Sequence, residues 1–206
     1  MQNSDEWAQE TASRIGRAVK TYRQRAGITA AQLATLTEEL GFPLNRVAIA
    51  KIENGHRRGK LDVTELIVLA RALQVPPVLL VYPDVPGGGV NLLPAHHPDA
   101  VPIESGSAAK WFGGVTSLFL GWEPFGDIEQ QYKTAENNRR PMELLLQRTS
   151  LSERRGEMRD TLLRLYENAA PPKGFLESLT DLDRQIREVE EQMRELGLTV
   201  DTELGR

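Results

Sequence analysis

The side chains best suited to bind a ligand lie in one basic stretch, residues 44–60, with the sequence LNRVAIAKIENGHRRGK. Asn45, Arg46 and Lys51 have long or hydrogen-bonding side chains, and the small residues Ala48 and Ala50 lie between them. Guanidinium, ammonium and carboxamide groups bind phosphate oxygens and the hydrogen-bonding edges of bases. The pattern is therefore typical of a helix whose slim outer face fits into a groove.

The charge distribution favours the same chemistry, although the whole chain has a net charge of −4. Residues 14–60 contain ten basic side chains against three acidic ones, whereas residues 84–206 contain 14 basic and 21 acidic side chains. A local positive excess of this kind is expected of a surface that binds a polyanion. The alternative explanation is a basic face that is simply solvated.

Two helices are predicted ahead of the basic stretch. Apolar residues at spacings of three, four and seven indicate a first helix over residues 7–26. Thr29, with Gln32 three residues later, forms a capping-box pattern that starts a second helix. The inner stripe of this second helix is predicted to consist of Leu33, Leu36 and Leu40.

The third helix is the one that carries the basic residues. Asn45 can cap it, it covers residues 46–54, and Gly55 ends it. Its inward-facing residues are expected to be Ile49 and Ile52, with Leu44 in the preceding turn. A fourth helix begins at Asp62 or Thr64 and is expected to bury Leu66, Ile67, Leu69, Ala70 and Leu73. VPPVLLVYP forms a last short turn or helix, so residues 1–83 are predicted to be a five-helix domain.

The rest of the chain differs in composition. Residues 84–107 are rich in proline and glycine, which predicts a linker or an irregular wrap. Residues 108–206 are expected to serve assembly or partner binding, beginning with an aromatic cluster at 108–126. Long helices of coiled-coil or helical-hairpin type follow, over 127–170 and 175–197. The apolar seam of the last helix packs either on the same chain or across a dimer and comprises Leu179, Leu182, Ile186, Val189, Met193 and Leu196.

Several segments together resemble a known family. They are IGRAVKTYRQRAGIT, NRVAIAKIENGHRR and LIVLARALQVPP. The chain is similar over residues 14–83 to the XRE (lambda-repressor-like) helix-turn-helix transcriptional regulators, in a variant common in actinobacteria. The resemblance implies an all-α, lambda-repressor-like domain that binds double-stranded DNA, with its third helix in the major groove.

The resemblance also assigns roles to residues of this sequence. Arg46 is expected to reach a guanine edge, Asn45 to read adenine or hold a phosphate, and Ala48 to touch a thymine methyl group. Thr29 and Gln32 lie where the start of the second helix can hold a phosphate. The remaining phosphate contacts are expected from Lys51, His56, Arg57 and Arg58. Each basic residue has an ordinary alternative role as an exposed solubility charge.

Three further details concern the frame of this domain. Arg23 and Glu53 correspond to a family pair that bridges the first and third helices. ATLTEELGFPLN makes the connection to the third helix about five residues longer than in the shortest family members. Ala30 and Ala31 lie where relatives often have a DNA-anchoring glutamine, so one family contact is expected to be absent.

Enzyme, metal and cofactor sites are not predicted. The chain has no cysteine, and no nucleophile elbow, HExxH or paired-carboxylate motif occurs. His96, His97 and Asp99 lie in a proline-rich loop, which is a poor cage for a metal ion. No apolar run approaches the length of a membrane span.

The function predicted from the sequence is that of a DNA-binding transcriptional regulator, cytoplasmic and associated with the nucleoid, and dimeric. Two linked units gain affinity because the second binds at a high effective concentration. A protein or small-molecule effector could bind residues 108–206. The alternative is a protein-interaction module, such as an antitoxin or regulatory adaptor, that keeps the helix-turn-helix as a scaffold.

Overall fold

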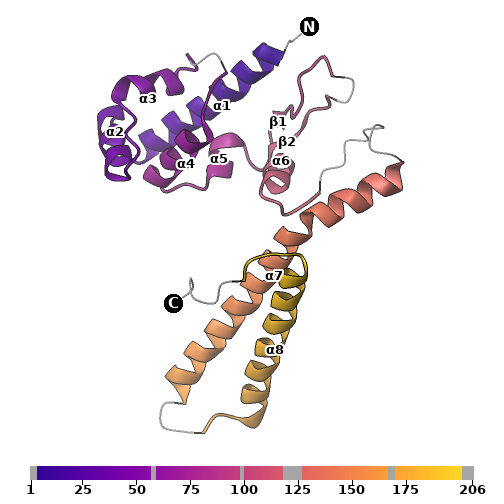
Figure 1. Ribbon diagram of the computed structural model, residues 1–206. Coiled ribbons are helices and arrows are strands. Elements are labelled where there is room, and N and C mark those ends of the chain that lie inside the picture. The colour runs from indigo at the N-terminus through magenta and orange to yellow at the C-terminus, as the bar shows by residue number, and fades with distance from the viewer. Residues whose placement is uncertain (1–3, 57–58, 98–99, 118–126, 167–169, 201–206) are drawn as a thin grey trace. The chain divides into compact units, whose positions relative to one another are not determined.

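The computed structural model describes residues 4–56, 59–97, 100–117, 127–166 and 170–200. The chain forms two compact units, Met1–Pro124 and Phe125–Arg206. The described residues form eight helices and one small sheet of two strands (Figure 1). The predicted all-α class, with five helices first and long helices last, is confirmed. None of the described helices is long and apolar enough to cross a lipid bilayer.

The first unit begins with five helices, as the apolar spacing predicted. They are α1 (Ser4–Arg25), α2 (Ala30–Glu39), α3 (Arg46–Glu53), α4 (Val63–Ala72) and α5 (Pro77–Val81). Each helix contributes one side chain to the core that is completely buried, because the five apolar stripes converge on a common centre. These five residues are Val19, Leu33, Ile49, Leu69 and Leu80.

Local capping explains where these helices start. The Asp62 side chain accepts from the Thr64 backbone N–H, and the Glu65 side chain accepts from the Asp62 backbone N–H, which makes a second capping box at α4. Of the two predicted starts for this helix, Asp62 is the one observed. The first turn of α4 therefore has partners for its otherwise free backbone donors.

Two predicted core positions are wrong. Leu40 is 44 % exposed because α2 ends at Glu39 and Leu40 serves as its C-cap. Ile67 is 55 % exposed, on the outer side of α4. Thr37, a polar residue that the apolar pattern did not select, is completely buried between α2 and α3.

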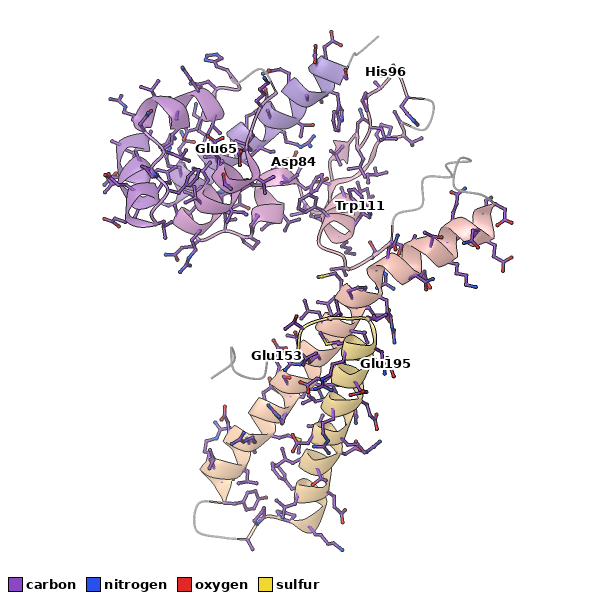
Figure 2. All side chains as sticks on the ribbon, viewed as in Figure 1. Glu65, Asp84, His96, Trp111, Glu153 and Glu195 are labelled. Atoms are coloured by element: carbon purple, nitrogen blue, oxygen red, sulfur yellow. The ribbon has the colours of Figure 1, made fainter. Side chains whose placement is uncertain are left out.

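Residues after α5 pack onto the same core. Strands β1 (Gly89–Val90) and β2 (Ile103–Glu104) pair antiparallel, and α6 (Ser105–Phe112) follows. Val90 and Ala108 are buried in the core of the five helices, and Trp111 lies at the exposed end of α6 (Figure 2). The Trp7 Nε1 donates to the Asn91 carbonyl over 3.0 Å, which fastens this segment to α1. The domain limits 1–83, 84–107 and 108–206 stay a prediction.

The second unit is a helical hairpin of α7 (Ile128–Leu165) and α8 (Lys173–Glu195). Its core confirms most of the predicted seam and contains Leu144, Leu151, Leu182, Ile186, Val189 and Met193. Leu165 and Leu196 are exposed, since they lie at the last residue of α7 and the C-cap of α8, respectively. The seam thus packs against α7 of the same chain, which is one of the two predicted arrangements.

Polar pairs across the hairpin match its two helices. The Arg148 guanidinium lies 2.8 Å from the Glu190 carboxylate, and Arg155 lies 3.2 Å from Asp183. Within each helix the two paired residues are seven positions apart, so both pairs recur on one face of the antiparallel hairpin. Helix α7 thus supplies arginines to acidic residues on the face of α8 that it contacts.

Candidate nucleic-acid interface

Helix α3 has one buried edge and one open face. Leu44, Ile49 and Ile52 are buried, as predicted, and they hold the helix by its inner edge. The open face carries side chains that are exposed, and these are Asn45, Arg46, Val47 and Lys51. Ala48 is half-buried between them. The sequence predicted no role for Val47, which is 61 % exposed and adds an apolar surface to this face.

The first turn of α3 is capped in a way that limits what Asn45 can do. Its side-chain Oδ1 accepts from the Ala48 backbone N–H over 2.9 Å. One lone pair of the carboxamide oxygen is therefore used by the cap, and the NH₂ group remains available as a donor. A donor at a helix N-terminus is suited to a phosphate oxygen, whereas two-point contact with adenine needs both atoms.

Three residues of α1, spaced seven positions apart, contact α3 on the side opposite its open face. This row consists of Gln9, Gly16 and Arg23. The Gln9 carboxamide donates to the Gly55 carbonyl just after α3. At Gly16 the two backbones touch, because a Cβ placed there would overlap the Ile52 carbonyl oxygen and lie 3.0 Å from the carbonyl carbon. The C-terminal end of α3 is thus held by α1 through contacts at Ile52, Glu53 and Gly55.

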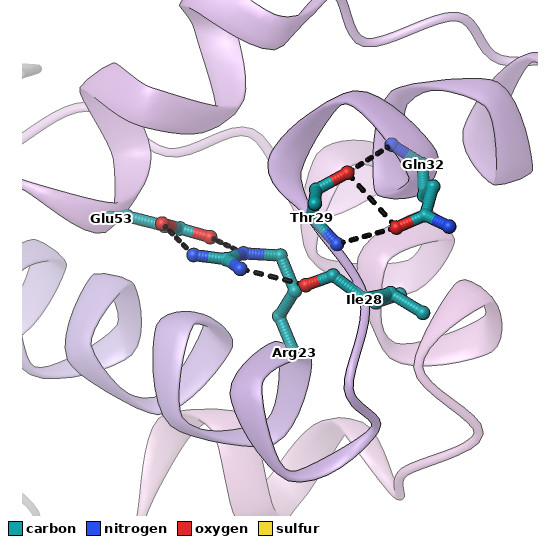
Figure 3. Close-up of polar contacts among 5 residues, drawn as sticks. All are labelled: Arg23, Ile28, Thr29, Gln32 and Glu53. Carbon is teal, nitrogen blue, oxygen red and sulfur yellow. Dashed lines mark hydrogen bonds and ion pairs between the residues drawn. The ribbon is translucent and has the colours of Figure 1, made fainter.

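Arg23 joins three elements (Figure 3). Its Nε and NH2 donate to the two carboxylate oxygens of Glu53 over 2.6 and 2.9 Å, and its NH1 donates to the Ile28 carbonyl over 2.8 Å. The hydrogen bonds that Arg23 donates to Glu53 raise the pKa of Arg23, so the guanidinium stays charged at any working pH. The predicted bridge between the first and third helices is confirmed, and it also fixes the turn that leads into α2.

The start of α2 lies beside this bridge (Figure 3) and shows the predicted capping box. The Thr29 hydroxyl accepts from the Gln32 backbone N–H over 3.2 Å, and the Gln32 Oε1 accepts from the Thr29 backbone N–H over 2.8 Å. The Gln32 NH₂ group has no use in this box, so it stays available as a donor at the helix N-terminus.

Thr29→Ala is expected to lower the free energy of unfolding by about 1 kcal/mol, because the first turn of α2 loses its side-chain acceptor. Urea unfolding followed by circular dichroism measures the change. The matched control is Thr35→Ala, since the Thr35 hydroxyl only donates back to the Ala31 carbonyl and its side chain is exposed. An equal loss in both variants would show that the capping box does not contribute.

The long connection between α2 and α3 is closed by a side chain. The Thr37 hydroxyl donates to the Ala34 carbonyl over 2.8 Å and accepts from the Leu44 backbone N–H over 3.0 Å. Leu44 is therefore held at the end of α2, directly before the cap of α3. The extra residues predicted from the sequence lie between Thr37 and Leu44, in a loop that projects into solvent. Phe42 and Pro43 in this loop are exposed.

Helices α2 and α3 are joined by this turn, and α1 holds α3 in place. This is the helix-turn-helix arrangement that the sequence predicted. Residues 14–81 match the helix-turn-helix domain family. No curated protein and no solved structure matches the chain. The match spans α1 from Arg14 to the end of α5 and supports DNA binding, and with it transcription regulation, for this helix-turn-helix region. The narrower likeness to XRE regulators of actinobacterial type stays a prediction.

The remaining predicted contact residues follow α3. His56 is exposed just after the helix, on the N-terminal side of the basic loop. Arg57 and Arg58 lie outside the described residues. Within the described part of the chain, neither Arg46 nor Lys51 forms an ion pair, so both charges are open to a ligand. Groups of three or more side chains suited to a metal ion are absent from the same described residues.

The basic residues predicted to form one electrostatic surface divide among several. Arg46 and Lys51 lie on the open face of α3, whereas Arg23 is neutralised by Glu53. Arg14 and Arg25 lie on another side of α1. Sequence reasoning missed this division because a sum over residues 14–60 contains no information about direction.

Proposed function

We propose that the chain is a sequence-specific DNA-binding transcriptional regulator that inserts α3 into the major groove. The observation that carries the proposal is the open face of α3, where unpaired basic groups project from a helix whose opposite edge is fully buried. A helix held in this manner fits the width of the major groove of B-DNA. Such a ligand would place the protein with the nucleoid in the cytoplasm.

The contacts proposed on this face divide by chemistry. Arg46 at the first turn is suited to the two acceptors of a guanine edge, and Val47 and Ala48 are suited to a thymine methyl group. Lys51 lies further along the helix and is suited to a phosphate, which sets register without reading sequence. The other phosphate contacts proposed are Thr29, Gln32, Asn45, His56, Arg57 and Arg58.

Arg46→Ala is expected to weaken binding to a preferred duplex by about 1–3 kcal/mol and to relax base preference at one position. A preferred duplex is first selected from a random pool, and affinity is then measured by fluorescence anisotropy over a range of salt concentrations. Lys51→Ala is expected to weaken binding to all duplexes equally and to reduce the salt slope by about 1.

Arg187→Ala is the matched control for these two variants, because Arg187 is an exposed arginine of α8, in the second unit. It removes the same charge from another surface and is expected to leave affinity unchanged. Equal affinity of wild type and Arg46→Ala for every duplex, with an unchanged circular dichroism spectrum, would contradict the proposed groove contact.

A homodimer is part of the proposal, since one helix-turn-helix unit alone buries little surface on DNA. Supporting it, the hairpin of the second unit leaves several leucines exposed, among them Leu145, Leu146 and Leu163. Apolar side chains of this kind are covered in an assembly. Sedimentation equilibrium of the full chain gives the mass in solution. A monomeric mass at the concentrations used for DNA binding would contradict the proposed homodimer.

The second candidate function is a protein-interaction module that keeps the helix-turn-helix as a scaffold. It is favoured by Trp111, Phe112 and Val115, large apolar residues that are all exposed at the end of α6. Aromatic residues are enriched where proteins bind partners. If no duplex from the random pool is preferred over any other, this candidate replaces the first. A protein or small-molecule effector of residues 108–206 belongs to either proposal.

A further inference from the structure

A second basic surface lies in the first unit, in a hollow of about 290 Å³ between α1 and the residues that follow α5. Three arginines line it, and the only acidic residue among its lining side chains is Asp84, labelled in Figure 2. The three are Arg14, Arg17 and Arg25. Tyr22 forms an aromatic wall beside them. The hollow therefore has a positive lining with room for a small ligand.

The hollow faces away from α3. The row on α1 that contacts α3 includes Gly16 and Arg23, and Arg14 and Arg25 are each two positions from a member of that row. Two positions correspond to about 200° around a helix, which is nearly the opposite side. A duplex bound along α3 would therefore not reach these arginines.

Two of the three guanidinium groups are held in place by neighbouring groups. The Arg14 Nε donates to the Val81 carbonyl over 3.0 Å, and its guanidinium carbon lies 5.7 Å from the centre of the Tyr82 ring. Arg25 lies 5.4 Å from the centre of the Tyr22 ring. Stacking on aromatic faces orients a guanidinium while leaving donors at its edge unused.

The positive charge of the hollow is balanced only in part. The carboxylates of Glu10 and Asp84 favour the charged form of Arg14, whereas three arginines line the hollow. Among the described residues, no carboxylate forms an ion pair with Arg14, Arg17 or Arg25, although ion pairs are common elsewhere in the chain. Burial lowers the pKa of Arg14, which shows that its charged form is held partly out of water. A partly desolvated arginine without a direct ion-pair partner gains from an anion more than a solvated one does.

We propose that this hollow binds the phosphoryl group of a small phosphorylated ligand. The planar forks of arginine match the oxygens of a phosphoryl group by paired hydrogen bonds. The volume is at the lower end of small-molecule sites, so it suits a compact ligand. This site is separate from the open face of α3 and does not depend on the function proposed for that face.

The test is a titration of the full chain with inorganic phosphate at constant ionic strength, followed by amide chemical shifts. Saturable shifts are expected for residues of α1 and residues 83–84. Arg17→Gln and Arg25→Gln are each expected to weaken phosphate binding roughly five- to tenfold, because each removes a charged hydrogen-bond donor. Asp84→Asn is expected to strengthen it, since a carboxylate at the hollow repels the anion.

Lys20→Gln is the matched control, because Lys20 is an exposed base of α1 that does not line the hollow. It is expected to leave phosphate binding unchanged. Arg17 is exposed, so its substitution is not expected to unfold the chain. Phosphate binding that is equally weakened by Lys20→Gln, or unaffected by the two hollow variants, would overturn the proposal. So would succinate binding as tightly as phosphate.

The phosphoryl group could also belong to a DNA backbone, and a second arm separates the two sources. The double variant Arg17→Gln/Arg25→Gln is expected to bind the selected duplex within about twofold of wild type, because distant charges are screened at physiological salt. A parallel loss of duplex and phosphate binding would make the hollow part of the DNA surface and overturn the proposal. The phosphate titration needs no duplex, so its outcome is independent of whether the chain binds DNA.

Discussion

Gly16→Ala is expected to lower the free energy of unfolding of the first unit by at least about 3 kcal/mol. The added methyl group would overlap the Ile52 carbonyl oxygen, and the atoms beyond it are also backbone of α3. A side chain can change rotamer to relieve a clash, whereas a helix backbone must move as a whole. The variant therefore forces α1 and α3 apart and should also weaken DNA binding.

Chemical denaturation followed by tryptophan fluorescence measures this effect. All three tryptophans lie before residue 124, so the signal reports on the first unit. The control is Gly156→Ala in α7, where a Cβ would meet nothing within 4 Å. Alanine is favoured over glycine inside a helix by up to about 1 kcal/mol, so this change should be neutral or stabilising for the second unit by circular dichroism. A wild-type midpoint for Gly16→Ala would refute the packing of α1 on α3.

The second large effect is expected for Arg23→Ala, a loss of about 3–5 kcal/mol in the free energy of unfolding. The side chains of Arg23 and Glu53 are only 13 % and 7 % exposed. Removing the guanidinium leaves the Glu53 carboxylate buried without its partner and the Ile28 carbonyl without its donor. An unpaired buried charge costs more than the pair contributes.

A double-mutant cycle separates the pair from its surroundings. Arg23→Met/Glu53→Met removes both charges and keeps most of the volume, so it is expected to be more stable than either single variant. Unfolding by urea, with the fluorescence signal described above, gives the four free energies. If the effects of the two single changes simply add, the two side chains are not coupled, and the expected contribution of the bridge is wrong.

The helix-turn-helix region was predictable because its signals are local. Capping boxes, a stop glycine and apolar spacing each depend on a few neighbouring residues, and Thr29, Asn45 and Gly55 lie where these rules place them. The inward direction of Ile49 and Ile52 follows from the same spacing. For the candidate site, the identity of the exposed basic residues could therefore be deduced before the structure.

Features that depend on two distant segments could not be deduced in the same way. Nothing around Gly16 shows that a second backbone lies against it, because a glycine within a helix has no single local meaning. Thr37 is polar, so the apolar pattern passed over it in favour of Leu40. Apart from the Arg23–Glu53 pair, a long-range signal in the sequence is the spacing of Arg148 and Arg155 on α7, which equals that of Asp183 and Glu190 on α8.

The Thr37 hydroxyl has a consequence for how this region can vary. By bonding both the end of α2 and Leu44, it closes the neck of the excursion formed by residues 38–43. Doubling the length of a flexible loop adds only about 0.6 kcal/mol of closure entropy. Residues inserted near Gly41 would therefore extend the loop into solvent, while the hydrogen bonds of Thr37 kept the orientation of α3 unchanged. The loop of residues 38–43 is thus a position where this protein can acquire additional surface without a change in the orientation of α3.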